Sequence, residues 1–383
     1  MRVLIVAVTD HLPAFLSAMN PATEVCAFVV DESEPAQAIA NKFNRGGVPI
    51  FPYWHLKESL ESFYFDYVIN ATRVQLCGTV IKELQNYDVT SDKMLSLVDL
   101  DVPTHIDSFT KLMTHYKNTA ERYNIFATGI SYIHNAIEIN QFELPTLNFA
   151  RGGQDLYYDF KIAKEVINTG GGRKNLRYAL IGLAPYSFSY DASRVVMESW
   201  RLLQWFLYFR DLHNYHMSAE NYASLFRKEY LDGGYVTPAP IELGNVYMNK
   251  AFNKTSAQTR FEYRQSAETW SKKYYPKTVA ENKQILHDYL TLCEEHEIKP
   301  ILFLPAMPRG YMETYPRNRL DEFHTILREI MSRHSTAVFF DGWQIRGLTD
   351  DDFADTTHLN VMGGAKFSHL LNRFVMQFER NGA

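Results

Sequence analysis

The sequence predicts an α/β protein with two doubly wound parallel-sheet domains. Short apolar runs, typical of strands buried on both faces of a parallel sheet, alternate with helical stretches along most of the chain. The 383 residues are enough for two domains, each with its own core. We expect the first domain to cover residues 1–103 and the second residues 104–383. The proposed joint lies at Val102-Pro103, where proline blocks a regular element.

Composition narrows the class of protein. Hydrophobic residues make up 46% of the chain and charged residues 22%, as in globular proteins, and the net charge of -5 argues against a nucleic-acid partner. Three cysteines distant in sequence, Cys26, Cys77 and Cys293, fit a reducing compartment better than a disulfide framework. The N-terminus lacks the features of a signal peptide, and no apolar run approaches the roughly 18 residues that span a bilayer. We therefore expect a cytoplasmic protein without a membrane span.

The first domain is expected to be Rossmann-like, with alternating strands and helices. Its predicted strands are 3–8, 24–30, 67–71 and 94–98. Its predicted helices are 10–19, 34–43, 54–63 and 74–85. The first turn, at Thr9-Asp10-His11, contains no Gly-x-Gly-x-x-Gly, so we expect no dinucleotide cofactor, although Asp31 stands where a ribose-binding acid would. Binding of a sugar nucleotide or of a protein partner at the strand ends remains an open alternative.

The second domain continues the alternation after an entry helix at 108–123. Its predicted strands are 124–127, 145–150, 178–184, 300–305 and 337–340. Its predicted helices are 132–142, 156–168, 279–296, 316–333 and 361–378. The alternation predicts a second parallel sheet covered by helices.

Two segments at opposite ends of this domain carry chemistry. Ser131 follows a strand and opens a helix, where its hydroxyl is exposed and the helix N-terminus favours developing negative charge. Asp355 and His358 lie three residues apart before the last helix, a spacing that lets the carboxylate hold the imidazole Nδ1 and leaves Nε2 as a base. Asp-x-x-His alone is common on surface turns, but together with Gly129-x-Ser131 it predicts a serine nucleophile with its base.

The order and spacing of these segments resemble the SGNH/GDSL hydrolase superfamily over about residues 123–380. Gly129-Ile130-Ser131 resembles the nucleophile block of that family, and Asp355-Thr356-Thr357-His358 resembles its Asp-x-x-His block. The resemblance implies a flavodoxin-like three-layer fold and the catalytic residues Ser131, His358 and Asp355. Pattern and spacing are also similar to the branch that contains the D-alanyl-transfer proteins of teichoic acid synthesis, which are exported.

The same resemblance implies an oxyanion hole, with one departure from the family pattern. Residues 150–155 resemble the block that supplies a backbone N–H, which implies Gly152 or Gly153 as donor. The Gly-x-Asn-Asp block is replaced by the sequence Gly-Leu-Ala-Pro-Tyr-Ser at residues 182–187, so its donor Asn is missing. Tyr186 or Ser187 could supply a hydroxyl instead.

The segment from about 191 to 277 is an insertion in this domain. Residues 192–212 are predicted to form one aromatic helix, and a helix apolar all round is buried or forms an interface, including a homo-oligomer interface. Residues 233–258, rich in Gly, Pro and Asn, could cover the site or belong to a dimerisation arm.

Three further motifs are interpreted as structural. The glycine run at 170–172 follows a helix and precedes a strand, the reverse of a phosphate loop, and is interpreted as a helix stop. His134 with Glu138 lacks further metal ligands, and His213 with His216 fits a solvated loop. We expect neither a metal nor a cofactor.

These observations lead to two hypotheses for function. The first is a serine esterase or acyltransferase that acts on an acylated carbohydrate, a surface-polysaccharide precursor or a small ester, with O-acetyl as the expected acyl group. The second, favoured by the missing Asn, is a non-catalytic SGNH-like scaffold or binding protein in surface-polysaccharide assembly. Hydrolysis and transfer use the same acyl-enzyme, so the sequence leaves that choice open.

Overall fold

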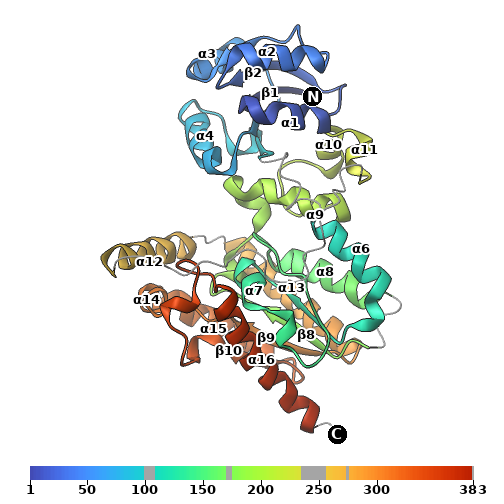
Figure 1. Cartoon of the computed structure of the whole chain (residues 1–383), viewed down its shortest axis with the longest axis vertical. Helices are drawn as coiled ribbons and strands as arrows, with labels where there is room; N and C mark the ends of the chain where they lie inside the picture. The colour runs from blue at the N-terminus through green and yellow to red at the C-terminus, as the bar shows by residue number, and fades with distance from the viewer. Residues whose placement is uncertain (99–107, 170–174, 234–255, 273–275, 382–383) are drawn as a thin grey trace. The chain divides into compact units, whose positions relative to one another are not determined.

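The computed structural model has two parallel five-stranded sheets with flanking helices, which confirms the predicted α/β class with two domains (Figure 1). The structure describes residues 1–98, 108–169, 175–233, 256–272 and 276–381. The predicted joint at Val102-Pro103, the glycine run at 170–172 and most of the segment 233–258 lie outside the described residues. The chain forms two compact units, which are treated separately below.

The first unit contains a sheet with strand order β3-β2-β1-β4-β5, the order of a Rossmann-type sheet. The strands are β1 (Arg2–Ala7), β2 (Glu24–Val30), β3 (Ile50–Pro52), β4 (Tyr67–Ala71) and β5 (Met94–Ser96). The helices between them are α1 (Leu12–Ala18), α2 (Ser33–Lys42), α3 (Leu56–Ser62) and α4 (Val74–Asn86). The sequence prediction missed β3, and the predicted helix at 10–19 begins with a short 3-10 turn, Thr9–His11.

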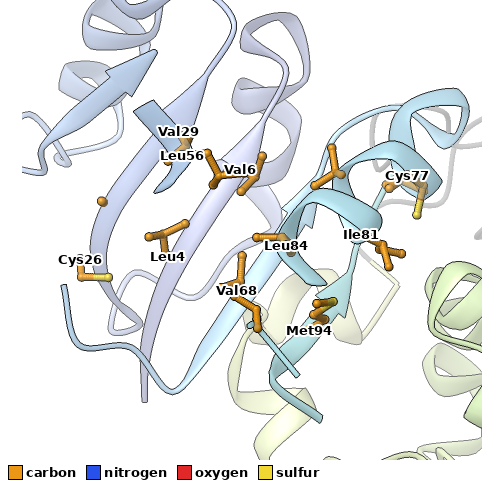
Figure 2. Close-up of a cluster of buried hydrophobic side chains, with 14 residues drawn as sticks. Leu4, Val6, Cys26, Val29, Leu56, Val68, Cys77, Ile81, Leu84 and Met94 are labelled. Carbon is orange, nitrogen blue, oxygen red and sulfur yellow. The ribbon is translucent and has the colours of Figure 1, made fainter. Parts of the chain in front are cut away.

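The core of the first unit forms where the apolar strands meet the inner faces of the helices. Leu4 and Val6 of β1 point to the same face of the sheet, because side chains alternate along a strand. They pack with Leu56 of α3 and Leu84 of α4, and all four are at most 1% exposed (Figure 2). The continuous burial along β1 and β2 explains why their sequences are apolar without alternation.

The described first part of the insertion belongs to the first unit, which comprises Met1–Lys111 and Ala192–Pro240. We predicted one helix over 192–212, but the structure has two 3-10 segments, Ala192–Arg194 and Val196–Arg201, before α9 (Leu202–Phe209). The β-branched Val195 lies at the break in an extended conformation and disfavours a continuous α-helix. Two short helices follow, α10 (Ala219–Ser224) and α11 (Lys228–Leu231).

The second unit, Leu112–Asp191 with Ile241–Ala383, contains a sheet with order β10-β9-β8-β6-β7. The strands are β6 (Ile125–Thr128), β7 (Thr146–Asn148), β8 (Tyr178–Gly182), β9 (Lys299–Leu304) and β10 (Val338–Asp341). Counted within this unit, the order is the 2-1-3-4-5 arrangement of flavodoxin-like sheets. The order reverses between β6 and β8, and ligands of such sheets bind where the carboxyl ends of the strands meet this switch point.

Helices cover the second sheet, and several of them pack in pairs. They are α6 (Ser108–Thr119), α7 (Ser131–Ala136), α8 (Leu156–Asn168), α12 (Ser256–Ser271), α13 (Pro276–Glu295), α14 (Arg309–Thr314), α15 (Arg317–Met331) and α16 (Val361–Asn381). Helix α16 lies against α7, and α13 lies against α8 and α15. Among the helices of at least 18 residues that the structure describes, none is apolar enough to cross a membrane.

Helix α7 is shorter than the predicted helix at 132–142. It ends at Ala136, after which Ile137 adopts an extended conformation. The side-chain amide of Asn148 donates to the carbonyl oxygens of His134 (3.1 Å) and Ile137 (3.4 Å) and satisfies groups that a continuing helix would otherwise bond. A side chain of β7 therefore sets the length of the helix that begins at Ser131.

Candidate active site

Ser131 lies at the carboxyl end of β6, at the switch point of the second sheet. The turn before it requires glycine, because Gly129 has φ +142°, a value that side chains disfavour. A Cβ there would also lie 2.4 Å from Cγ1 of Ile133 and 2.8 Å from the carbonyl oxygen of Gly182. Ile130 is extended, and the helix begins directly at Ser131. The turn thus presents Ser131 with its backbone N–H among the unbonded donors of the first helical turn.

The Asp355–His358 segment is a tight turn built around one carboxylate. Oδ1 of Asp355 accepts hydrogen bonds from the backbone N–H groups of Thr357 (2.8 Å) and His358 (2.9 Å). The turn is closed by an antiparallel bridge between Phe353 and Leu359. This arrangement is an Asx-type turn, in which Asp replaces a backbone carbonyl as acceptor.

The three predicted catalytic side chains form one chain of hydrogen bonds. Nδ1 of His358 lies 2.8 Å from Oδ2 of Asp355, and Nε2 lies 2.9 Å from Oγ of Ser131. Because an ionised carboxylate only accepts, Nδ1 carries the proton and Nε2 of a neutral ring accepts from the serine hydroxyl. The geometry is that of a nucleophile paired with an oriented base.

The ionisation of Asp355 fits this assignment. Burial of the carboxyl raises its pKa, but the hydrogen bond and charge of His358 and the N–H groups of Thr357 and His358 outweigh burial and lower the pKa to about 2. Asp355 is therefore a carboxylate throughout the neutral range. Its side chain remains 42% exposed, against 19% for His358.

Two contacts around the turn were not predicted from the sequence. The ring of Tyr132 lies against the imidazole of His358, with centroids 5.0 Å apart and planes tilted by 58°. Oγ of Ser266, on α12, lies 2.9 Å from Oγ1 of Thr356. Position next to the nucleophile could have pointed to Tyr132, whereas the contact of α12 depends on tertiary packing.

The loop after β7 carries the two predicted backbone donors. The N–H of Arg151 donates to the carbonyl of Gly129 (3.0 Å), which joins this loop to the nucleophile turn. Gly153 has φ +74°, and its carbonyl accepts from Oη of Tyr190 (3.1 Å). Gly152 and Gly153 are thus held in a loop bonded to the turn before Ser131.

The two predicted hydroxyl donors lie beyond the end of β8. Oγ of Ser187 accepts from the N–H of Ala184 (2.8 Å), the residue at the position where the Gly-x-Asn-Asp pattern would have its Asn. Tyr186 is buried, with its ring edge-to-face with Tyr132 and Tyr190. Burial and the neighbouring tyrosines raise the pKa of Tyr186 well above its usual value, so its hydroxyl stays protonated. The amide of Asn282 fixes this segment by donating to three backbone carbonyls, those of Ser187, Phe188 and Tyr190.

The other sequence motifs adopt structural positions. His134 points Nδ1 at the carbonyl of Ala150 (2.9 Å), and Glu138 caps a short 3-10 helix rather than pairing with His134. In the first unit, Oδ1 of Asp31 accepts hydrogen bonds from both the N–H (2.7 Å) and the hydroxyl (2.6 Å) of Thr9. This oxygen therefore bonds to the turn after β1.

Comparisons with known proteins add little. No family model and no curated protein matches the chain. A solved structure described as a candidate platelet activating factor from Streptococcus pneumonia aligns with 78% of this chain and 98% of its own, at 10% identity and a TM-score of 0.38. This similarity is too low to indicate a function.

Proposed function

We propose that this chain is a serine esterase or acyltransferase that works through an acyl-serine intermediate. The observation that carries the proposal is the continuous hydrogen-bond chain from Asp355 through His358 to Ser131, with contacts of 2.8 and 2.9 Å. If the Asp355–His358 segment were only a surface turn, nothing would require its histidine to contact a serine 227 residues away in sequence. This geometry activates a hydroxyl as a nucleophile.

The proposed reaction begins with attack of Ser131 Oγ on an ester carbonyl. Nε2 of His358 takes the hydroxyl proton as the Oγ–C bond forms, and Asp355 stabilises the resulting imidazolium. When the tetrahedral intermediate collapses, His358 returns the proton to the leaving alcohol and the acyl group stays on Ser131. Water or a second alcohol, deprotonated by His358, then releases the acyl group.

The developing oxyanion needs donors, and we propose the backbone N–H groups of Ser131 and of Gly152 or Gly153, with Tyr186 or Ser187 as the hydroxyl donor. Each donor in such a hole supports about 10²–10³ in rate. Ala184, at the place of the missing Asn, supplies no side-chain donor. We therefore expect a slower enzyme than one with the complete set.

The proposed substrate is an acylated carbohydrate or surface-polysaccharide precursor, with O-acetyl as the expected acyl group. Aromatic rings near the site are consistent with a sugar ligand, because Tyr presents an apolar face and a hydroxyl together. Tyr132, whose ring lies against His358, is such a residue. The competing hypothesis, a non-catalytic scaffold, is favoured only by the missing Asn.

A fluorophosphonate probe tests the proposal, because it phosphonylates an activated serine and needs no natural substrate. We expect the wild type to be labelled at Ser131 and to hydrolyse p-nitrophenyl acetate. Ser131→Ala should abolish labelling, and His358→Ala should slow it by orders of magnitude, because an unassisted serine hydroxyl is a poor nucleophile.

Ser189→Ala is a suitable control for this test. Ser189 also lies near the end of β8, but its hydroxyl donates to the carbonyl of Tyr186 (3.1 Å) and contacts no base in the part of the chain that is described. Labelling should survive this substitution. A folded wild type that neither reacts with the probe nor turns over the ester would favour the scaffold, and labelling that persists in Ser131→Ala would point to Ser187.

A further inference from the structure

A buried carboxyl group lies behind the nucleophile turn and has no part in the proposed acyl transfer. Asp159, in the first turn of α8, is 2% exposed. Carboxyl groups are rarely buried this completely without a cation, because desolvation of the charge is costly. The partners of this group therefore indicate why it is there.

Asp159 bonds to both loops of the candidate site. Nε2 of Gln154, the residue after Gly153, lies 2.6 Å from Oδ1 of Asp159. The backbone N–H of Gly129, two residues before Ser131, also bonds to the Asp159 carboxyl. One side chain on α8 thus joins the turn that presents the nucleophile to the loop that carries the proposed backbone donors.

Asp159 and Asp155 lie four residues apart but have different surroundings. Asp155 is the N-cap of α8 and accepts from the N–H of Tyr158 (3.1 Å), a role for an ionised carboxylate. Burial and the charge of Asp155 raise the pKa of Asp159, and these effects outweigh the hydrogen bonds from Gln154 and Gly129. Two nearby carboxyl groups in such settings separate into one ionised and one protonated group.

The contact with Gln154 agrees with a protonated Asp159. A separation of 2.6 Å is short for N–H···O but ordinary for O–H···O. If the Gln154 amide is turned by 180°, the Asp159 hydroxyl donates to Oε1 and the same separation is explained. In the orientation shown, Oε1 of Gln154 is buried and has no hydrogen-bond partner among the described residues. One end of this amide is therefore unpaired in either orientation, so the short contact with Asp159 is what favours the turned one.

We propose that Asp159 is a positioning residue, which through Gly129 and Gln154 holds the nucleophile turn and the Gly152-Gly153 loop at the separation that acyl transfer needs. This inference rests on the proposed function, because it assigns the two loops to one reaction. It adds a residue that the Ser131–His358–Asp355 chain does not include. Asp159 acts through backbone geometry and touches no substrate.

The test compares two substitutions in the full-length chain. Asp159→Asn keeps the shape and one donor and one acceptor, so fluorophosphonate labelling of Ser131 should stay close to the wild-type rate. Asp159→Leu removes every hydrogen bond and should slow labelling roughly 10- to 100-fold, because small misplacements of reacting groups have effects of this size. With an ester substrate, the loss should fall on kcat rather than KM.

Asn372→Leu is the matched control for lost stability. Asn372 is also buried in the second unit and also accepts a backbone N–H, that of Glu143 (3.1 Å), but it lies on α16 away from the two loops. Its loss should lower Tm and leave the labelling rate unchanged. If Asp159→Leu does not fold, Gln154→Leu takes its place and should slow labelling at an unchanged KM.

Hydrogen–deuterium exchange separates this proposal from the proposed function. Peptides that contain Gly129 and Gly153 should exchange faster in Asp159→Leu than in the wild type, Asp159→Asn or Asn372→Leu, whether or not the protein reacts with the probe. If the wild type is not labelled but the peptides show this difference in exchange, the proposed function is wrong and the role of Asp159 in joining the two loops still holds. A folded Asp159→Leu with wild-type labelling and wild-type exchange of both peptides overturns the positioning role.

Discussion

At the scale of single residues, the candidate site depends on where protons reside. Asp355 accepts hydrogen bonds from two backbone N–H groups and from Nδ1 of His358. The same carboxylate therefore shapes the turn and also fixes the tautomer of the imidazole. Removing its charge should therefore disturb the turn as well as the base. The effect on folding can be measured without a substrate.

We predict that Asp355 contributes a stability that is lost in acid. Its folded pKa of about 2 is below the value of 3.8 usual for this group, so the unfolded chain binds more protons between these values. The contribution is complete above about pH 4 and disappears as the pH falls toward 2. Tm should fall more steeply over this window in the wild type than in Asp355→Asn. The exposed Asp351, replaced by Asn, serves as control and should keep the wild-type slope.

The sequence predicted these residues unevenly, for a physical reason. Asp355 and His358 interact within one turn, so their spacing alone predicts that they meet. Ser131 could be proposed because a strand-to-helix turn has a local pattern. Asp159 could not be proposed in this way, since Gly129 reaches it only when β6 and α8 pack, and its contact with the nearby Gln154 does not by itself indicate a role.

At the scale of elements, the position of α7 depends on a close contact with two glycines. The side chain of Ile133 fills the space beside Gly129 and Gly182, at the ends of the adjacent strands β6 and β8. A Cβ at Gly182 would lie 2.3 Å from Cγ1 and 2.6 Å from Cδ1 of Ile133. This contact sets how closely the helix carrying Ser131 approaches the sheet.

Gly182→Ala should therefore move α7 and weaken the fold. Overpacking of this kind costs about 1–3 kcal/mol, and the displaced Ser131 should react more slowly with the fluorophosphonate probe. Ile133→Ala in the same chain makes room for the added methyl group, so the double variant should be less impaired than the two single losses predict. Gly47→Ala has open space around its Cβ and should leave Tm nearly unchanged. Strictly additive losses in a thermal melt would show that Ile133 does not carry the contact.

Elements were predictable where they are long and apolar. The sequence prediction for β2, Glu24–Val30, matches its observed bounds, because six consecutive buried residues after Glu24 have no competing pattern. Strand β3 has three residues and ends at Pro52, too short for any periodicity. The early end of α7 escaped prediction, because the Asn148 side chain that satisfies its last carbonyls comes from a neighbouring strand.

At the scale of the whole molecule, each compact unit is assembled from two separate stretches of chain. The first unit includes a segment that follows Asp191 in the chain, and backbone contacts join this segment to the rest of the unit. Phe226 forms an antiparallel bridge with Met19, and the N–H of Arg227 donates to the carbonyl of Ala18 (2.8 Å). Trp200 packs against the core shown in Figure 2. A homo-oligomer through the aromatic insertion stays a prediction.

A fragment of residues 1–111 should consequently be less stable than the same fragment joined by a flexible linker to residues 192–233. The short fragment lacks the partners of Ala18 and Met19 and exposes apolar surface that Trp200 covers. Thermal unfolding followed by circular dichroism should show a lower Tm or no cooperative transition for the short fragment. Equal melting curves would mean that the first stretch folds independently of the second.

The distance along the chain between Ser131 and His358, 227 residues, also has a consequence in time. A ribosome adds roughly 5–20 residues per second, so about 10–45 s separate the synthesis of the nucleophile from that of its base. During this interval the newborn polypeptide holds a serine with no partner to activate it. Reactivity toward esters would arrive only when the closing helix docks, which delays any acylation until the rest of the second sheet has been translated.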